Sequence, residues 1–346
     1  MQQLNARQQK ILDFLSEKEF VSNSDIIAFL GSDVSRFTVL RDLKYLIGEN
    51  LIRKSGKGKA VKYELFLKNP ILSYINPDEY FRKGPDERIL RSDYFDQEVF
   101  GYLDNLFSKE EIDELKKINS KYVDGISKMD EGRLKKEIER MNIELSWKSS
   151  QIEGNTYSLI DTEMLIKERV EPEGHEKREA IMILDHKNAI DYIFNNKNDF
   201  KKLDLFHVEK IHELLTRGQN VKSGIRHEFV RITGTRYVPP TNRAEIVNYL
   251  YKIIDTVNSL KDPFSKALTV VLMISYLQPF FDGNKRTARI LGNAVLLANN
   301  VCPLSYRSMS EADYKKAILL FYEQNSARFF KELFIEQFKF AVDNYF

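Results

Sequence analysis

The chain has 346 residues, 42% of them hydrophobic and 30% charged, with a formal net charge of +2. This size fits two or three domains, and the near-neutral charge excludes a strong overall preference for nucleic acid or for acidic membranes. The single Cys302 excludes an internal disulfide and predicts a buried thiol in a reducing, cytoplasmic setting. The absence of a signal-peptide pattern and of a long apolar span argues against a membrane protein.

Residues 1–67 predict a small separate domain. Apolar residues recur at helical spacing over 6–16, 23–30 and 35–48. The following segment, 51–65, predicts two strands around a Gly-Lys-Gly tip. Three short helices followed by a two-stranded wing form the pattern of a winged helix-turn-helix, which is a common DNA-binding module.

The third of these helices carries short hydroxyls and cations, which suit the phosphates and base edges of a major groove. Residues 1–67 hold eleven Lys plus Arg against eight Asp plus Glu, an excess of only three. A domain that packs, dimerises or docks on a protein is therefore the alternative to DNA binding. The residues expected to contact DNA, from this helix and the wing, are Ser35, Arg36, Thr38, Arg41, Lys44 and Lys57.

A polar connection with several prolines and glycines follows, and helical patterns resume near Phe95. We expect 68–130 to be a linker and helical region, 131–175 to be a second part and 176–346 to be the main core. Dense Lys and Glu with periodic apolar residues predict surface helices laid on a bundle over 108–148. The predicted fold is mainly α-helical with two small β features. Further helical patterns cover 176–195, 205–217, 244–259, 266–277, 287–299 and 312–344.

Two short segments within this helical part carry further signals. The string from Ser149 to Gly154 closes a long helical pattern, and by itself it indicates a helix end capped by glycine with a solvated Glu153. The segment 230–240 has two β-prone runs around a Thr-Gly-Thr turn and a proline stop, which predicts a hairpin.

The segment 278–289 reads Gln-Pro-Phe-Phe-Asp-Gly-Asn-Lys-Arg-Thr-Ala-Arg and opens the second of two buried helices, where anions bind. Glycine lets a ligand approach the backbone, asparagine tolerates turn geometry, and three cations lie within five residues. Asp282 would repel phosphate unless Mg²⁺ lies between them. A plain turn that opens a solvated basic helix is the alternative. The residues expected to bind nucleotide are Gly283, Asn284, Lys285, Arg286 and Arg289.

This segment resembles the Fic motif, His-x-Phe-x-Asp/Glu-Gly-Asn-Gly-Arg-x-x-Arg. The resemblance implies a Fic-type core that binds ATP with Mg²⁺ and transfers AMP to a Ser, Thr or Tyr hydroxyl of a target protein or of the chain itself. Two positions depart from the motif: Gln278 replaces the catalytic histidine, and Lys285 replaces a glycine of many adenylyltransferases. The lysine also occurs in Doc-like kinases, so phosphate transfer is an alternative. The matching residues are Phe280, Asp282, Gly283, Asn284, Arg286 and Arg289.

Gln278 puts the transfer reaction in question. A carboxamide cannot accept a proton near neutral pH, and loss of a general base typically costs about 100- to 10,000-fold. Three explanations stay open: a nucleotide-binding pseudoenzyme, an enzyme with altered chemistry, or a chain whose histidine was replaced by design. His207 and His212 are interpreted as structural or surface residues, whereas His227 borders the predicted site and is a candidate substitute base.

The resemblance extends to the two short segments, so 131–175 is expected to be an inhibitory helix region and 176–346 to be the Fic core. Ser149, Glu153 and Gly154 match an inhibitory motif in which the glutamate pairs with the second motif arginine, here Arg289, and keeps the γ-phosphate from its seat. The hairpin matches a flap that holds the target segment by strand addition. The flap residues expected to meet the target are Thr233, Gly234, Thr235 and Tyr237.

Two further expectations follow from the whole pattern. Fic proteins often self-associate, so a homo-oligomer is expected. The rival to an enzyme is a DNA-binding transcriptional regulator in which the Fic core senses nucleotide and the winged helix reads DNA.

Overall fold

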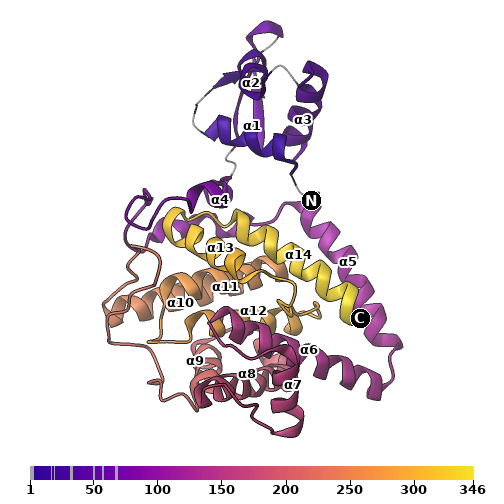
Figure 1. Cartoon of the computed structure of the whole chain (residues 1–346), viewed down its shortest axis with the longest axis vertical. Coiled ribbons are helices and arrows are strands. Elements are labelled where there is room, and N and C mark those ends of the chain that lie inside the picture. Colours follow the sequence, from indigo (N-terminus) through magenta and orange to yellow (C-terminus); the bar gives the residue numbers. More distant parts are fainter. Residues whose placement is uncertain are drawn as a thin grey trace. The chain divides into compact units, whose positions relative to one another are not determined.

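The computed structural model describes residues 4–16, 18, 20–31, 34–49, 51–56, 58–66 and 69–346. The chain divides into two compact units, Met1–Arg88 and Ile89–Phe346. Figure 1 shows that helices make up most of the second unit, whereas the first unit combines helices with a small sheet. Of the helices described, none is long and apolar enough to cross a membrane.

The first unit is built from three helices of eight or more residues, a one-turn helix α4 and a small antiparallel sheet. Ser22 caps the second helix and Ser35 caps the third, each accepting a hydrogen bond from a backbone N–H of the first turn. The strand order is β1-β3-β2, and Tyr63 pairs with both Val21 and Lys54. The elements are α1 (Ala6–Ser16), β1 (Val21–Ser22), α2 (Asn23–Leu30), α3 (Arg36–Gly48), β2 (Ile52–Ser55), η1 (Gly58–Ala60), β3 (Lys62–Leu65), η2 (Pro70–Leu72) and α4 (Pro77–Tyr80).

One apolar core holds this unit together. Ile11, Leu12, Ile26, Val39 and Leu43 are each no more than 1% exposed, and they come from all three helices. The helix limits predicted from the apolar spacing agree with the observed ones, because each spacing places its apolar residues on the face that meets this core. The short strand β1 was not predicted.

The second unit is a helical bundle. Its elements are η3 (Gln97–Asn105), α5 (Lys109–Lys128), α6 (Glu131–Ile152), α7 (Leu159–Glu168), α8 (Lys177–Asn195), η4 (Lys197–Lys201), α9 (Leu205–Thr216), α10 (Arg243–Ser259), α11 (Pro263–Leu277), α12 (Asn284–Ala298), α13 (Glu311–Gln324) and α14 (Arg328–Tyr345). The single helical stretch expected over 312–344 is broken at Asn325, which has φ 51° and caps α13. Asparagine tolerates this left-handed geometry better than most residues do.

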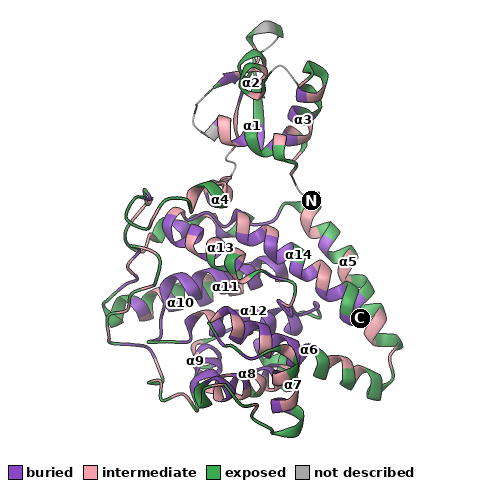
Figure 2. Ribbon diagram, in the orientation of Figure 1, coloured by how far each residue is buried: buried purple, intermediate pink, exposed green. Residues whose placement is uncertain are grey.

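Helices α11 and α12 form the centre of the bundle. Figure 2 colours both almost wholly as buried, and α12 also packs against α6, α8 and α9. The two central helices approach closely at Gly292, where an added Cβ would lie 2.7 Å from the Cγ2 of Val271. The loop that joins them is therefore anchored at both ends by buried helices.

The predicted hairpin over 230–240 is wrong. The chain does turn at Thr233–Gly234, but within the described residues 69–346 no ladder joins the two arms. Instead, Val238 makes a parallel bridge with Tyr94, and its N–H donates to the carbonyl of Asp93 at 2.8 Å. An isolated two-stranded hairpin is marginal in water, so pairing with this upstream segment replaces it.

Candidate functional site

The loop between α11 and α12 is held in one shape by its own side chains. Gln278 ends α11 at φ 51°, and Gly283 precedes α12 at φ 79°. The side chain of Asn284 clasps the loop, because its Oδ1 accepts from the N–H of Phe280 at 2.9 Å and its Nδ2 donates to the same residue's carbonyl at 2.8 Å. Phe280 is buried and stacks on His212, with ring centroids 3.7 Å apart. The loop is thus a rigid platform.

The start of α12 can bind an anion. Its N-cap is Gly283, which offers no side chain to accept from the first backbone N–H groups. These groups carry the positive end of the helix dipole. The first two turns of α12 also carry three cations, Lys285, Arg286 and Arg289, and the two arginines are at most 2% exposed. The N-terminus of α12 and these cationic side chains therefore concentrate positive charge at the start of the helix.

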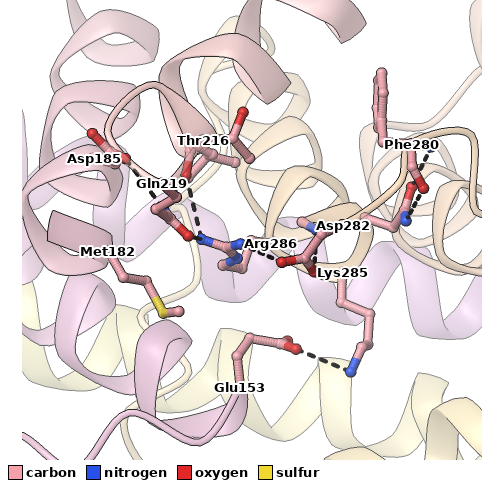
Figure 3. A network of polar contacts seen from close by, with 12 residues as sticks. Glu153, Met182, Asp185, Thr216, Gln219, Phe280, Asp282, Lys285 and Arg286 are labelled. Atoms are coloured by element: carbon pink, nitrogen blue, oxygen red, sulfur yellow. Dashed lines mark hydrogen bonds and ion pairs between the residues drawn. The ribbon is translucent and has the colours of Figure 1, made fainter. Parts of the chain in front are cut away.

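Arg286 is held by neighbours on α9, in the turn that follows α9, and on the loop (Figure 3). Its Nη1 donates to the Oε1 of Gln219 at 2.9 Å and to the carbonyl of Leu215 at 3.3 Å. Gln219 in turn donates to the carboxylate of Asp185 at 3.1 Å. Burial lowers the pKa of Arg286, but a guanidinium stays charged near neutral pH. Sequence reasoning missed Gln219 and Asp185, because nothing in their local pattern points to the loop.

Glu153 forms ion pairs with two cations of the site. Its Oε1 lies 2.9 Å from the Nη2 of Arg289, and its Oε2 lies 3.0 Å from the Nζ of Lys285. Figure 3 shows the pair with Lys285. Burial acts to raise the pKa of Glu153, but the two cations outweigh it and hold that pKa at about 2. The structure therefore brings together Glu153 and Arg289, as the sequence predicted, and adds Lys285, which sequence reasoning had not linked to Glu153.

Ser149 and Gly154 lie on either side of this contact. Ser149 accepts from the Nε of Arg289 with its Oγ at 2.9 Å and from the Nη2 with its backbone carbonyl at 2.8 Å. Gly154 has φ 98°, which lets the chain turn away directly after α6. The glycine thus serves as the helix end predicted from sequence, but the Glu153 side chain pairs with Arg289 and is only 16% exposed.

Gln278 is occupied with holding the loop. Its side chain Nε2 donates to the carbonyl of Ser275 at 2.6 Å and approaches the hydroxyl of Tyr322 at 3.3 Å. Its Oε1 accepts from Asn284 at 2.9 Å. All of these contacts are buried, since Gln278 is 8% exposed. The amide has no titratable proton acceptor to offer a hydroxyl group.

Asp282 faces solvent at the mouth of the loop. Its side chain is 64% exposed, its Oδ2 lies 3.6 Å from Arg286, and its Oδ1 accepts from the N–H of Gly283 at 2.6 Å. Through the whole described part of the chain, no group of three or more His, Cys, Asp or Glu could hold a metal ion. An exposed single carboxylate fits the way Mg²⁺ is usually held, by one or two carboxylates and the phosphates of a nucleotide.

Buried hydrogen bonds connect the segment expected to be a flap to the end of α11 and the loop that follows it. Arg226 is 3% exposed and donates to the carbonyl of Gln278 at 2.7 Å and to that of Pro240 at 2.6 Å. Tyr237 is buried, and its hydroxyl donates to the carbonyl of Tyr276 at 2.8 Å. It therefore supports the segment and does not face solvent. The turn residues Thr233 and Gly234 are exposed, and Thr235 is half-buried.

The structure places four histidines inside, near or outside the site, and one of them, His186, was not singled out from the sequence. His212 is fully buried and donates from Nε2 to the carbonyl of Asp282 at 3.0 Å, so it is structural and belongs to the loop. His207 is buried, and its Nδ1 lies 2.8 Å from a carboxylate oxygen of Asp204. His227 is exposed. His186 was overlooked, yet its Nε2 lies 2.7 Å from the Oγ of Ser149, inside the site.

Of the residues expected to bind DNA, those that the structure describes lie on α3 or at its N-cap. The cations Arg36, Arg41 and Lys44 are exposed on α3. Ser35 caps this helix and shares a hydrogen bond of 2.9 Å with Thr38. Lys57 lies outside the described residues.

The part of the chain that contains the loop between α11 and α12 is similar to proteins of a known family. Residues 202–296 match the model of the Fic/DOC family. A probable protein adenylyltransferase of Aquifex aeolicus is 31% identical over 100 residues, which are 28% of this chain and 31% of that protein. The protein adenylyltransferase Fic of Nematostella vectensis is 25% identical over 189 residues, 52% of this chain and 43% of that protein. The matches thus span less than half the length of these relatives.

Two solved structures share the fold. Fic-1 (residues 134–508) of C. elegans aligns with a TM-score of 0.59 at 18% identity, over 68% of this chain and 70% of that one. A Fic domain containing signaling protein of Bacteroides thetaiotaomicron aligns with a TM-score of 0.54 at 17% identity, over 66% of this chain and 95% of that one. At these identities the likeness concerns the fold alone.

Proposed function

We propose, from the premise that residues 202–296 are a domain of the Fic/DOC family, that this protein binds ATP with Mg²⁺ at the loop between α11 and α12. The observation that carries the proposal is the position of the Glu153 carboxylate between Arg289 and Lys285. A carboxylate that bridges two cations at the start of a helix occupies a place suited to a phosphate group. In this proposal, the terminal phosphate of ATP and Glu153 compete for the same cations.

The remaining residues have matching roles in this binding mode. Arg286 and the first N–H groups of α12 would hold phosphate oxygens, and Asp282 would hold a Mg²⁺ ion, which would supply positive charge to the phosphates. The exposed turn at Thr233 and Gly234 is where a target segment meets the site. Glu153 keeps the affinity for ATP low until something displaces it.

The proposed reaction type is AMP transfer to a protein hydroxyl, as the names of the relatives indicate for those proteins. The target oxygen attacks the α-phosphorus, pyrophosphate leaves, and the hydroxyl proton needs an acceptor. Gln278 cannot accept it, and its amide is already bound to Ser275, Tyr322 and Asn284. Without a general base we expect transfer to be slower by about 100- to 10,000-fold than with a histidine.

Labelling with [α-³²P]ATP and Mg²⁺ tests both the proposed control of ATP binding by Glu153 and the proposed effect of Gln278 on AMP transfer. We expect no labelling of the unaltered chain, weak labelling of Gln278→His, and strong self-labelling of the variant that also carries Glu153→Gly. The matched control is Arg286→Ala in the double variant, which should lose the label. Labelling of the unaltered chain at a rate that Gln278→Ala leaves unchanged would refute the role of Gln278. Failure of Glu153→Gly to bind ATP would refute the nucleotide site itself. Labelling from γ-³²P instead of α-³²P would mean phosphate transfer of the Doc-like type.

A second proposed function concerns residues 1–67. Helix α3 exposes Arg36, Arg41 and Lys44, and the antiparallel pair β2 and β3 follows it. This arrangement supports a winged helix-turn-helix that binds duplex DNA through α3. If the Fic domain acts as a nucleotide sensor for this domain, ATP should change the affinity for DNA, and Arg289→Ala should abolish the change. Equal DNA affinity with and without ATP would count against the coupling.

A further inference from the structure

A buried hydrogen-bond chain connects His186 on α8 to Arg289 on α12 through Ser149 on α6. The Nε2 of His186 lies 2.7 Å from the Oγ of Ser149, and this Oγ lies 2.9 Å from the Nε of Arg289. All three residues are fully buried. Neither the loop nor the inhibitory segment includes His186 in sequence, since it lies 37 residues after Ser149.

The direction of each hydrogen bond follows from the proton inventory. The Nε of Arg289 can only donate, so the Oγ of Ser149 accepts from it. The proton of the Ser149 hydroxyl then has a nearby acceptor in the Nε2 of His186. The other ring nitrogen, Nδ1, lies 3.4 Å from the carbonyl of Met182, which can only accept. The neutral imidazole with its proton on Nδ1 satisfies both contacts, whereas the opposite tautomer would set a lone pair against the carbonyl of Met182.

Ser149 holds the guanidinium of Arg289 in two places at once. Its Oγ takes the Nε proton, and its backbone carbonyl takes a proton of Nη2 at 2.8 Å. These two bonds fix the plane of the guanidinium, and the Nη2 also reaches Glu153 at 2.9 Å. A hydroxyl can rotate, so the first bond has a defined direction only if the hydroxyl proton is itself held. His186 supplies the acceptor that holds it.

We propose that His186 is a positioning residue for Arg289, acting through the hydroxyl of Ser149 to aim the guanidinium at the anion that occupies the site. The anion is the Glu153 carboxylate in the structure and the terminal phosphate of ATP in the proposed function. The role of His186 in ATP binding rests on that proposed function. His186 touches neither anion, so it takes no part in any proton transfer to a substrate.

The tautomer gives a test that needs no nucleotide. In the unaltered chain, ¹⁵N spectra of the histidine rings should show His186 with a bare Nε2 and a protonated Nδ1. In Ser149→Ala, the hydroxyl donor is gone, and this preference should weaken or reverse. A protonated Nε2 in the unaltered chain would overturn the inference, whether or not the protein binds ATP.

Two substitutions of similar size separate positioning from simple packing. His186→Gln places an amide oxygen where Nε2 lies, and so can still accept from Ser149, whereas His186→Asn reaches only the place of Nδ1. Both are made in Glu153→Gly, in which Arg289 is free to bind a phosphate. We expect the asparagine variant to bind ATP about 5- to 10-fold more weakly, the value of one or two hydrogen bonds. The glutamine variant should stay within about twofold of its parent.

ADP supplies the control, because it lacks the terminal phosphate that Arg289 would bind. Its affinity should be equal in the asparagine and glutamine variants. A loss of ATP and ADP affinity alike, or equal losses in both variants, would mean that His186 only supports packing. A double-mutant cycle completes the test: in Ser149→Ala, changing His186 to Asn should have no further effect on ATP affinity. If the parent Glu153→Gly binds neither nucleotide, the proposed function fails, and the tautomer measurement alone decides this inference.

Discussion

Replacing Glu153 should change stability and nucleotide affinity in opposite directions. In the substitution Glu153→Gln, the carboxylate that pairs with Arg289 at 2.9 Å and with Lys285 at 3.0 Å becomes a neutral amide of the same shape. Arg289 is fully buried, and leaving such a charge without its partner typically costs about 3 to 5 kcal/mol. Ser149 still accepts two of its N–H groups, so we expect a loss near the lower limit, about 3 kcal/mol.

The same unpaired cation should attract the terminal phosphate of ATP. A charge-assisted hydrogen bond is worth about 1.5 to 3 kcal/mol, and Glu153 no longer competes for it, so ATP should bind about 10- to 100-fold more tightly. ADP does not reach the contested cations in this proposal and should gain less than about threefold. Saturating ATP should therefore restore much of the lost stability, because a ligand that binds only the folded state stabilises it.

Two measurements on the same variants check this reasoning. Urea unfolding without nucleotide gives the change in the free energy of unfolding, and calorimetric titration gives the affinities for ATP and ADP. Lys285→Met is the matched control, because Lys285 is 29% exposed and its removal leaves the pair with Arg289 in place; we expect it to cost at most about 1 kcal/mol. Unchanged stability and unchanged ATP affinity in Glu153→Gln would refute the argument that the carboxylate and the phosphate compete.

Three other predictions concern separate parts of the chain. Burial lowers the pKa of His212 to about 4, so the unfolded chain binds its proton near pH 6.5 and the folded protein does not; the contribution of His212 to stability should therefore fall by about 3 kcal/mol from pH 6.5 to pH 4. His212→Gln keeps a donor for Asp282 and should flatten this part of the unfolding profile, and an unchanged slope would contradict it. Gly292→Ala should destabilise the protein by about 1 to 2 kcal/mol in thermal unfolding, because the new methyl group meets Val271. For the proposed DNA contact, Arg41→Ala should weaken duplex binding for all sequences and lower the slope against log salt by about one; an unchanged slope would remove α3 from the interface.

The helical elements could be predicted from the sequence because their apolar spacing reports the face that each helix buries. The limits of α1 and α2 agree with such spacing, whereas α11 begins at Pro263, three residues before the predicted start, because Asp262 caps it. The loop could also be predicted, since its residues are consecutive in the chain. Its rigidity rests on Asn284, whose side chain bonds to Phe280 and Gln278, a few residues away.

The parts that could not be predicted depend on residues far apart in the chain. Val238 bridges Tyr94, and no local pattern indicates this pairing. A β-prone segment with a central turn predicts a hairpin only if no other strand competes for its backbone groups, and here one does. In the same way, His186 reaches Ser149 only because α6 and α8 pack side by side.

Different residues of the proposed site serve phosphate binding and proton transfer. Glu153 can therefore affect nucleotide binding although Gln278 cannot act as a base. Phosphate binding in the proposed site depends on the helix start, Arg286 and Arg289, and none of these needs a proton acceptor at position 278. Gln278 keeps the loop in shape through the buried bonds of its amide, so the loss of the base leaves the platform intact. In the proposed function, Glu153 would regulate whether nucleotide occupies the site, and not how fast AMP is transferred. Control of ATP binding by Glu153 would be useful to a protein that acts through its ATP-bound form. Such control favours a nucleotide-dependent switch over a fast transferase.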